Sequence, residues 1–376
     1  MKKIYLDNAA STPLHKEVIN TMTDVIQKYY GNPSSTHSFG RETKSIIENA
    51  RKTIGKELKC QSNEIIFTSG GTEANNLILR SAVQDMGVKR IITQPVEHKS
   101  VLETVLDLSK KHHIILEMLP IDSKGNFNLN DLEQKLKSGT AKTLVSLIHG
   151  NNETGNLVNL EKITTLCHEN NALFHSDTVQ TIGHYVFDLN TLPIDFISCS
   201  AHKMHGPKGV GFAFARKSLG LHSTITGGKQ ERNKRSGTEN VYGIAGLAKA
   251  FEMAYENLEE NRRKITNLKK YAIEQFKQQF EDCIFIGESG NIETGLYTIL
   301  NVGLKNQSKL LTFELDLKGI AISQGSACES GSTKKSHVIQ SIHTLEEQNT
   351  YANLRISFSI YNTKEDIDLL IKSLKN

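Results

Sequence analysis

Short apolar runs alternate with helical patterns from about residue 40 to residue 250, and this alternation restricts the folds that the chain can adopt. Strand-like and helix-like segments in alternation predict a mostly parallel sheet covered by helices, which is an α/β architecture. Ligands bind such sheets beyond the C-terminal ends of the strands. Polar residues that directly follow the apolar runs are therefore the candidates for chemistry. These runs cover residues 64–69, 90–94, 143–149, 172–177 and 195–200.

The chain changes character after about residue 240. Residues 241–280 carry apolar side chains near helical spacing and contain no proline, which predicts a long helix that can bend. Beyond it, residues 297–303 and 354–360 have the pattern of strands, and residues 309–319 and 365–375 that of helices. We therefore expect a second, smaller α+β domain after the first.

Composition excludes several classes of function. Lys+Arg 45 against Asp+Glu 41 gives a formal charge of only +4 over 376 residues, so no nucleic-acid footprint is expected. No apolar run approaches the roughly 20 residues of a membrane span. The number of cysteines is odd, and they form no C-x-x-C, which argues against a disulfide framework or a zinc site and favours a cytoplasmic protein. Four of them, Cys60, Cys167, Cys199 and Cys283, fall beside helical or strand-like patterns and are expected to be structural.

The stretch FTSGGTEANN combines a strand end, a glycine turn and a helix start. The strand ends at Ser69, Gly70 and Gly71 form the turn, and the helix begins near Thr72. Free backbone N–H groups and the positive end of the helix dipole predict an anion site there. The P-loop pattern and G-x-G-x-x-G are both absent, so the anion would be a phosphate held without those nucleotide motifs. Ordinary helix capping by Ser69 or Thr72 is the alternative.

Asp177 and Gln180 come at the end of a buried strand, in HSDTVQ, and their spacing lets both face one crevice. A carboxylate at a strand end could keep a ring nitrogen protonated, as an electron-sink cofactor requires. The alternative is that Asp177 only caps a helix.

Lys203 and His98 also follow strands. Lys203, beside Ser200 and His202 in CSAHKMHGPKG, suggests a Schiff-base amine, although most lysines are solvated, as Lys208 is expected to be. His98 is either a hydrogen-bonded scaffold residue or, next to a lysine and an anion site, a proton shuttle or ring-stacking partner. Together the anion site, the Asp–Gln pair, the lysine and the histidine match what pyridoxal phosphate needs.

The lone Cys328 stands in SQGSACESGS, among small and polar residues with no second cysteine near it. A lone cysteine usually behaves as a small buried hydrophobe. Nothing apolar follows Cys328 directly, so a polar loop is expected to carry this thiol.

These motifs resemble those of the NifS/IscS-type cysteine desulfurases, which belong to the class-V aminotransferase family of fold-type I pyridoxal-phosphate enzymes. The resemblance runs nearly end to end and implies a large cofactor-binding domain over residues 15–250. Residues 1–14 and 251–376 would form the small domain. The matching stretches are YLDNAASTP, GNPSSTHSFGR, FTSGGTEANN, EHKSVL, HGNNETG, HSDTVQ, SAHKMHGPKGVG, RSGTEN, GSACES and LRISFS.

The resemblance also implies roles for individual residues. Lys203 would bind the cofactor covalently, and His98 would stack on its ring. Asp177 would pair with the ring nitrogen, whereas Asn152 and Gln180 would lie on the phenolate-oxygen side. The phosphate would be held by Gly71, Thr72, Ser200 and His202, and by Thr238 from the partner subunit of a homodimer. Arg355 would bind the substrate carboxylate, with Asn32 nearby.

The resemblance also implies that the thiol of Cys328 attacks the sulfur of bound L-cysteine and becomes a persulfide. The implied partner is a sulfur-acceptor protein of iron–sulfur cluster assembly or thiolation. Gln324 and the residues after Cys328 depart from the family pattern, which puts the usual acceptor in doubt. The alternatives are a selenocysteine lyase, another class-V transaminase or lyase, and a non-catalytic sulfur-relay scaffold. A transaminase would not need Cys328, and a scaffold would not need Lys203, Asp177 and His98.

Overall fold

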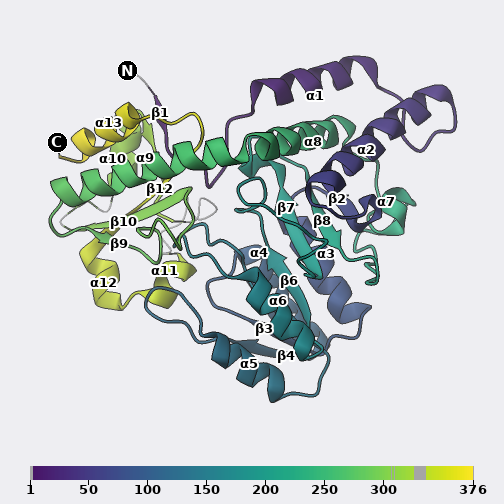
Figure 1. Ribbon diagram of the computed structural model, residues 1–376, viewed down its shortest axis with the longest axis horizontal. Helices are drawn as coiled ribbons and strands as arrows, with labels where there is room; N and C mark the ends of the chain where they lie inside the picture. The colour runs from purple at the N-terminus through teal and green to yellow at the C-terminus, as the bar shows by residue number, and fades with distance from the viewer. Residues whose placement is uncertain (1–2, 306, 309, 326–335, 376) are drawn as a thin grey trace.

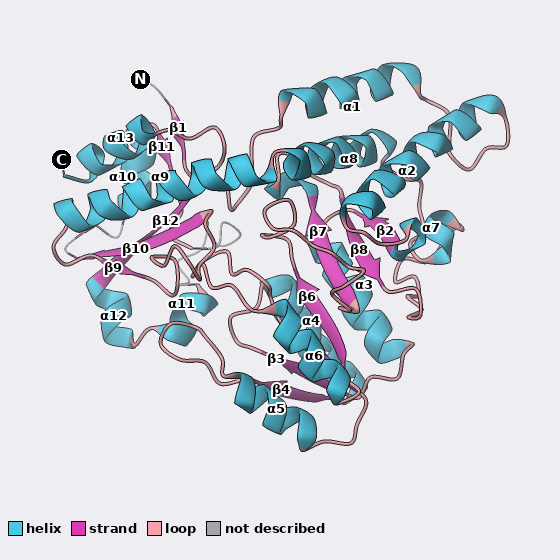
Figure 2. Ribbon diagram, viewed as in Figure 1, coloured by secondary structure: helices cyan, strands magenta, loops and turns pink. Residues whose placement is uncertain are grey.

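The computed structural model describes residues 3–305, 307–308, 310–325 and 336–375. Its centre is a seven-stranded sheet of order β2-β8-β7-β6-β5-β3-β4 (Figures 1 and 2). Strand β8 pairs antiparallel with β2 and β7, whereas the other neighbours pair in parallel, so the predicted mostly parallel sheet is confirmed. The strands are β2 (Ile65–Thr68), β3 (Arg90–Thr93), β4 (Ile115–Met118), β5 (Thr143–Ser146), β6 (Leu173–Asp177), β7 (Phe196–Ser200) and β8 (Gly211–Ala215).

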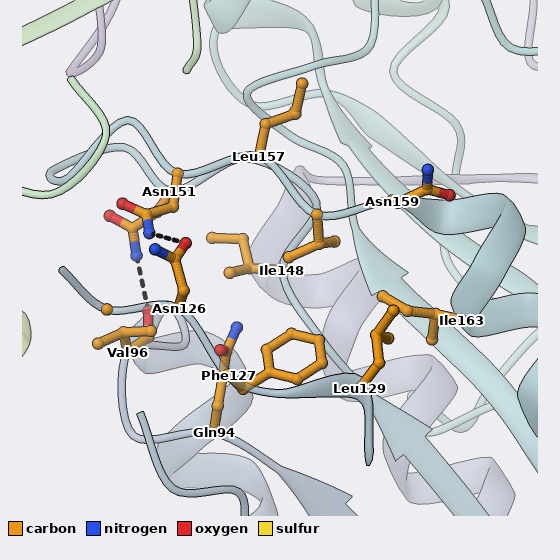
Figure 3. Close-up of a pocket in the computed structure, with 13 residues that line it drawn as sticks. Gln94, Val96, Asn126, Phe127, Leu129, Ile148, Asn151, Leu157, Asn159 and Ile163 are labelled. Atoms are coloured by element: carbon orange, nitrogen blue, oxygen red, sulfur yellow. Dashed lines mark hydrogen bonds between the residues drawn. The ribbon is translucent and has the colours of Figure 1, made fainter. Parts of the chain in front are cut away.

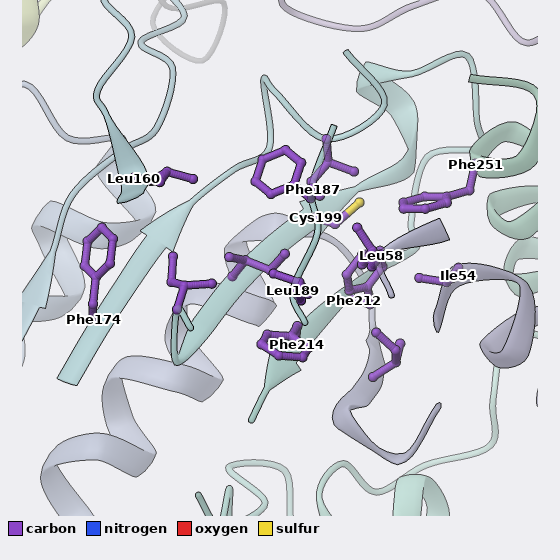
Figure 4. Packing of buried hydrophobic residues seen from close by; sticks show 14 of the residues in the cluster. Ile54, Leu58, Leu160, Phe174, Phe187, Leu189, Cys199, Phe212, Phe214 and Phe251 are labelled. Atoms are coloured by element: carbon purple, nitrogen blue, oxygen red, sulfur yellow. The ribbon is translucent and has the colours of Figure 1, made fainter. Parts of the chain in front are cut away.

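Helices cover both faces of this sheet because its strands are apolar on both sides. Phe67, Phe174 and Phe212 belong to the core on one face, part of which Figure 4 shows. That face is covered by α2 (Ser38–Glu57), α5 (Leu129–Lys137), α6 (Leu160–Glu169) and α8 (Val241–Glu256). Ile66 and Ile91 belong to the core on the other face, under α3 (Gly71–Gln84) and α4 (Lys99–His112). Helix α1 (Lys16–Lys28) packs on α8.

The C-terminal part forms a second layer around a three-stranded sheet of order β12-β10-β9. The long helix expected over 241–280 is two helices, because the helical backbone is interrupted at Asn257 between α8 and α9 (Leu258–Gln279). The other elements are β1 (Ile4–Tyr5), β9 (Ile284–Phe285), β10 (Ile299–Lys305), α10 (Leu311–Leu317), β11 (Ile320–Ala321), α11 (His337–Ile342), α12 (Leu345–Thr350), β12 (Tyr351–Ser357) and α13 (Lys364–Lys375).

The N-terminus packs with this C-terminal layer. Strand β1 pairs in parallel with β11, and Ile4 and Leu6 are buried in the same apolar cluster as residues of β10 and β12. In Figure 1 both ends of the chain lie on the side of the three-stranded sheet. This packing supports our proposal that residues 1–14 join residues 251–376 in a small domain beside the large domain 15–250.

A buried ion pair ties the segment after β8 to the central sheet. Both guanidinium nitrogens Nη1 and Nη2 of Arg51 donate to the carboxylate of Glu231, at 2.8 and 2.7 Å, and the Phe67 N–H donates to the same carboxylate at 2.8 Å. Glu231 and Arg232 have φ of +44° and +57° within α7 (Gln230–Asn233). Residues other than glycine seldom adopt this left-handed region. The buried hydrogen bonds of the Glu231 carboxylate therefore offset an unfavourable backbone conformation.

Glu231→Ala should lower the free energy of unfolding by about 3 kcal/mol, because the buried guanidinium of Arg51 keeps, among the residues described, only Glu48 as a carboxylate partner, at 3.4 Å, and the Phe67 N–H loses its acceptor. Equilibrium denaturation measures this loss. Glu133→Ala is the matched control, since Glu133 is 41% exposed beside Lys137 and should contribute about 1 kcal/mol or less. Equal losses in the two variants would contradict the account of this ion pair.

Candidate active site at the carboxyl edge of the central sheet

Lys203 lies at the carboxyl edge of the central sheet, where the short helix η2 (Ala201–Lys203) directly follows β7. Its Nζ donates to the carbonyl oxygens of Ala9 and Ala10, the latter at 2.9 Å. The N–H and the hydroxyl of Thr12 both donate to the His202 carbonyl oxygen, at 2.9 and 3.0 Å. The N-terminal segment therefore fixes the turn that contains His202 and Lys203. Sequence reasoning gave these residues no role, because backbone acceptors leave no residue-type signal.

Asp177 ends β6, the neighbour of β7, and its carboxylate is almost fully buried. One oxygen accepts from the Val179 N–H at 3.0 Å and the other from Asn75 Nδ2 at 2.8 Å. A carboxylate offers about four lone-pair positions, so these bonds leave capacity for a ligand N–H. Gln180 Nε2 donates to the Ala9 carbonyl at 3.1 Å, the same acceptor that Lys203 uses.

His98 is the N-cap of α4, and its Nδ1 accepts the Ser100 N–H at 3.1 Å. Burial lowers the pKa of His98, the negative charge of Asp177 raises it, and the positive charge of Lys203 lowers it. Hydrogen bonds through Ser100 and Asn75 link the imidazole to the Asp177 carboxylate. The two alternatives for His98 are thus compatible, since one ring edge is scaffold while the residue lies next to the predicted catalytic lysine.

Helix α3 begins at Gly71 without a side-chain cap, so the capping alternative for Ser69 and Thr72 is wrong. A Cβ at Gly71 would lie 2.5 Å from Val179 Cγ2, which means that only glycine allows this approach of the backbone. A Cβ at Gly70 would lie 3.4 Å from the Ser200 hydroxyl oxygen, so that hydroxyl borders the helix start. An N–H-rich helix start, the helix dipole and a hydroxyl make this position a candidate anion site.

His202 provides an unpartnered polar atom close to Lys203. Its Nδ1 is buried and has no hydrogen-bond partner in the described part of the chain. Burial, together with the positive charges of Lys203 and Lys208, lowers the pKa of His202 to about 4. A neutral imidazole with a buried, unsatisfied nitrogen is expected to have its partner in a bound ligand.

Arg355 connects the C-terminal sheet with the large sheet. It lies in β12, is 1% exposed, and donates from Nη2 to Asp7 at 2.8 Å and from Nη1 to the Asn152 carbonyl oxygen at 3.4 Å. Its Nε is buried without a partner among the residues described. Arg355 and Asn152, which lie far apart in the sequence, therefore meet. Asp7 was not anticipated, although it stands in the quoted motif YLDNAASTP.

Two predicted site residues are not joined to this cluster. Thr238 is exposed on the segment after α7. Asn32 is exposed in the loop between α1 and α2, where its Oδ1 accepts the Ser34 N–H at 2.9 Å, and this loop lies on the opposite side of Figure 1 from β12. Cys328 lies outside the described residues. The roles given to these three stay predictions.

The other four cysteines are poor nucleophiles. Burial, with a contribution from Glu64, raises the pKa of the Cys60 thiol to about 12. Burial also raises the pKa values of Cys167, Cys199 and Cys283. Because the thiolate is the reactive form, none of these four is suited to attack sulfur at neutral pH.

Other kinds of site have less support. A cavity of about 170 Å³ lies between the 125–129 segment and the start of α6, lined by side chains such as Phe127, Ile148 and Ile163 (Figure 3). It contains neither Lys203 nor His98, and we do not assign it to the candidate active site. Within the described ranges, no three His, Cys, Asp or Glu side chains gather as metal ligands would. None of the helices described there combines the length and apolar character that crossing a membrane requires.

Comparison with known proteins agrees with this geometry. The family model for aminotransferase class-V matches residues 4–370. The chain is 39% identical to "Cysteine desulfurase IscS" of Dictyoglomus turgidum, over 100% of this chain and 94% of that protein. It is 38% identical to "Putative cysteine desulfurase IscS 1" of Bacillus subtilis, over 99% and 97%. A solved structure titled "NIFS-LIKE PROTEIN" superposes with a TM-score of 0.90 at 35% identity, covering 100% of this chain and 98% of that one. The chain belongs to the class-V aminotransferase family, among its NifS/IscS-type members.

Proposed function

We propose that the protein is a pyridoxal-phosphate-dependent cysteine desulfurase that converts L-cysteine to L-alanine and leaves the sulfur as a persulfide on Cys328. One observation carries the proposal. Lys203 follows β7 and Asp177 ends the neighbouring β6 at the carboxyl edge of the central sheet, and hydrogen bonds through Ser100 and through Asn75 of α3 link His98 to Asp177. The names printed for the full-length relatives, cysteine desulfurase IscS, agree with it.

The residues present fit pyridoxal phosphate. The α3 N-terminus, with Gly71 and Thr72, together with Ser200 and the unsatisfied Nδ1 of His202, suits a phosphate. The buried Asp177 carboxylate suits a protonated ring nitrogen, and Gln180 and Asn152 are assigned to the phenolate-oxygen side. When bound, the cofactor supplies an electrophilic aldehyde carbon and a conjugated electron sink.

The side chains of the chain itself then have separate tasks. Lys203 provides the amine that anchors the cofactor and takes the proton from Cα of the substrate. Arg355, fixed by Asp7 at 2.8 Å, binds the substrate carboxylate and so orients Cα toward Lys203. The Asp177 carboxylate would hold the ring nitrogen of the cofactor and favour its protonated form.

Sulfur transfer is balanced without an external oxidant. The Cys328 thiolate attacks the sulfur of bound L-cysteine, an S–S bond forms, and the Cβ–S bond of the substrate breaks. The electron pair of that bond stays on Cβ, which takes up a proton and becomes the methyl group of alanine. The substrate carbon is thereby reduced, and the transferred sulfur is oxidised to the sulfane level in the persulfide.

The proposal is tested with protein reconstituted with pyridoxal phosphate and given L-cysteine and excess dithiol, which releases the persulfide sulfur as sulfide. We expect alanine and sulfide in equal amounts. Formation of a 2-oxo acid instead would support a transaminase, and turnover of L-selenocysteine but not L-cysteine would support a lyase of that substrate. No turnover of any of these by protein that has bound the cofactor would support a non-catalytic scaffold. Each of these three outcomes contradicts a cysteine desulfurase.

We further propose a cytoplasmic homodimer in which Thr238 reaches the phosphate of the partner's cofactor. The support is that helices α1 and α2 both pack on α8, at the top of Figure 1, and that each of the three helices carries large exposed apolar side chains. Among them are Ile26, Phe39 and Tyr242, with exposed fractions of 57%, 50% and 49%. Large exposed apolar side chains grouped on neighbouring helices are typical of interfaces between proteins.

Heterodimers should therefore rescue two inactive variants. Thr238→Asp places a carboxylate against the phosphate and should weaken cofactor binding, whereas Lys203→Ala lacks the amine. In a mixed dimer, the subunit that keeps Lys203 receives an intact Thr238 from its partner. Random pairing gives about half heterodimers with one intact site of two, so the mixture should recover about a quarter of wild-type activity.

The matched control for this mixing experiment is Ser138→Asp, an exposed position beyond the end of α5, which should be fully active alone. Recovery close to zero from a verified heterodimer would place Thr238 at the phosphate of its own subunit. Full activity of a monomer in sedimentation would contradict the dimer.

The product persulfide needs an acceptor. We propose an acceptor protein of iron–sulfur cluster assembly or thiolation, in keeping with the IscS name of the relatives. Adding candidate acceptors singly to the persulfide form and measuring the sulfur that each takes up would identify it. Uptake by small thiols alone would contradict a dedicated acceptor protein.

A further inference from the structure

A buried hydrogen-bond network connects His98 with Asp177 through residues that have no role in the proposed function so far. We propose that His98 works as a neutral imidazole carrying its proton on Nε2, and that Ser100 and Asn75 are positioning residues that hold it in this form. The inference rests on the proposed function, because it specifies how His98 faces cofactor and substrate. It assigns His98 a hydrogen-bond donor role and leaves proton abstraction to Lys203.

Two groups of Ser100 contact Nδ1 of His98. The Ser100 backbone N–H donates to it at 3.1 Å, and the Ser100 hydroxyl oxygen lies 2.7 Å away. A backbone N–H can only donate, so Nδ1 must present its lone pair. A neutral imidazole carries one proton, which therefore lies on Nε2.

The contacts of Asn75 fix the direction of the Ser100 hydroxyl. Asn75 Nδ2 lies 2.8 Å from Asp177 Oδ2 and 2.8 Å from Ser100 Oγ. An ionised carboxylate only accepts, so the amide nitrogen of Asn75 must face Asp177. Its second proton goes to Ser100 Oγ, so the hydroxyl proton of Ser100 points to His98 Nδ1 and shares its lone pair with the Ser100 N–H.

The contacts on the Oδ1 side of Asn75 agree with this orientation of the amide. Its Oδ1 lies 3.1 Å from Nε2 of His175, which must then donate, and Nδ1 of His175 accepts from the Ser146 hydroxyl at 2.9 Å. Burial lowers the pKa of His175 to about 4, although Asp177 opposes this, so the residue has the single proton that this arrangement requires. Every hydrogen in the network thus has one consistent place.

The consequence is a histidine that resists protonation. An imidazolium would direct an Nδ1–H at the Ser100 N–H and remove the cap of α4, and the positive end of that helix dipole opposes a cation. Burial and the charges of Lys203, His337 and Lys99 lower the pKa of His98, against the opposing negative charge of Asp177. With Nδ1 occupied, the polar group left for a ligand is Nε2–H.

Nitrogen-15 NMR of the imidazoles tests the proposal in protein without cofactor, so the result does not depend on desulfurase activity. His98 is assigned by the signal that His98→Gln removes. At neutral pH we expect a pyridine-type Nδ1 and a pyrrole-type Nε2. An Nδ1–H tautomer or an imidazolium would overturn the inference, while a functioning desulfurase would still support the proposed function.

Variants separate positioning from general stability. Ser100→Ala keeps the backbone donor, so the proton should stay on Nε2, but the loss of the hydroxyl at 2.7 Å should shift the Nδ1 resonance toward that of a less strongly hydrogen-bonded pyridine-type nitrogen, and Ser100→Thr should restore the wild-type shift. Ser81→Ala removes another buried serine hydroxyl of the same layer, bonded to His222 at 3.1 Å, and should leave the His98 signals unchanged. Identical His98 signals in Ser100→Ala and wild type would overturn the role of Ser100.

The activity of His98 variants with bound cofactor provides a second test of the donor role. His98→Gln keeps an N–H donor and should retain activity within about tenfold of wild type, whereas His98→Phe keeps only the ring and should lose about 100-fold or more. Equal losses in the two variants, at the size expected for loss of a base, would contradict the donor role.

Discussion

Lys203→Ala is expected to lower alanine formation from L-cysteine by about three orders of magnitude or more, because it removes the amine proposed to bind the cofactor and to take the Cα proton. The effect is on chemistry rather than on folding. Lys203 is bonded to two backbone carbonyls, those of Ala9 and Ala10, and is not part of the apolar core. Alanine yield under saturating L-cysteine measures the loss.

Borohydride reduction followed by peptide mapping provides the direct check on Lys203. In wild type the reduced cofactor should remain on the peptide that contains Lys203. Lys208→Ala is the matched control, since Lys208 is exposed five residues further on and should keep near wild-type activity. Label on Lys208, or turnover by Lys203→Ala close to that of wild type, would contradict the assignment.

Cys328→Ala should separate cofactor chemistry from sulfur transfer. Binding of L-cysteine and loss of its Cα proton use Arg355 and Lys203, so the variant should still change its visible spectrum when L-cysteine is added. Alanine and sulfide release should fall by about three orders of magnitude, since oriented neighbours cannot replace a covalent nucleophile. Stopped-flow absorbance followed by alanine analysis measures both parts.

The control for this variant is Cys283→Ala, which removes a half-buried thiol whose pKa is raised and should leave turnover unchanged. If Cys328 were only a packing residue, its replacement by alanine would lower stability slightly and leave alanine release near normal. That result would exclude the persulfide mechanism.

Much of the fold could be predicted because buried parallel strands are short, continuous apolar runs. The run 143–149 predicted β5, which spans Thr143–Ser146, and the run 195–200 predicted β7. Strand β8 was missed because it begins at Gly211 in a stretch that has the composition of a turn. Strand β4 was missed because Glu117 interrupts its short apolar run. The helix break at Asn257 was missed because no proline stands near it in the sequence.

The candidate site was predictable where side chains follow strand ends. Asp177 and Lys203 were found in this way, since the carboxyl ends of neighbouring parallel strands meet at one edge. Asn75 was not found, because its partner Asp177 lies 102 residues away and an Asn inside a helix has no pattern of its own. The carbonyl groups of Ala9 and Ala10 were missed for a similar reason, since they act through the backbone.

In the proposed mechanism, sulfur moves from L-cysteine to Cys328 as alanine forms. The most direct test is a single turnover without added thiol, with limiting L-cysteine, in which one sample gives both the alanine yield and the mass of the peptide that contains Cys328. We predict one added sulfur on that peptide for each alanine formed, and none on the peptides of the other four cysteines. Alanine formed without added sulfur on Cys328, or with the sulfur on Cys60, Cys167, Cys199 or Cys283, would contradict the account.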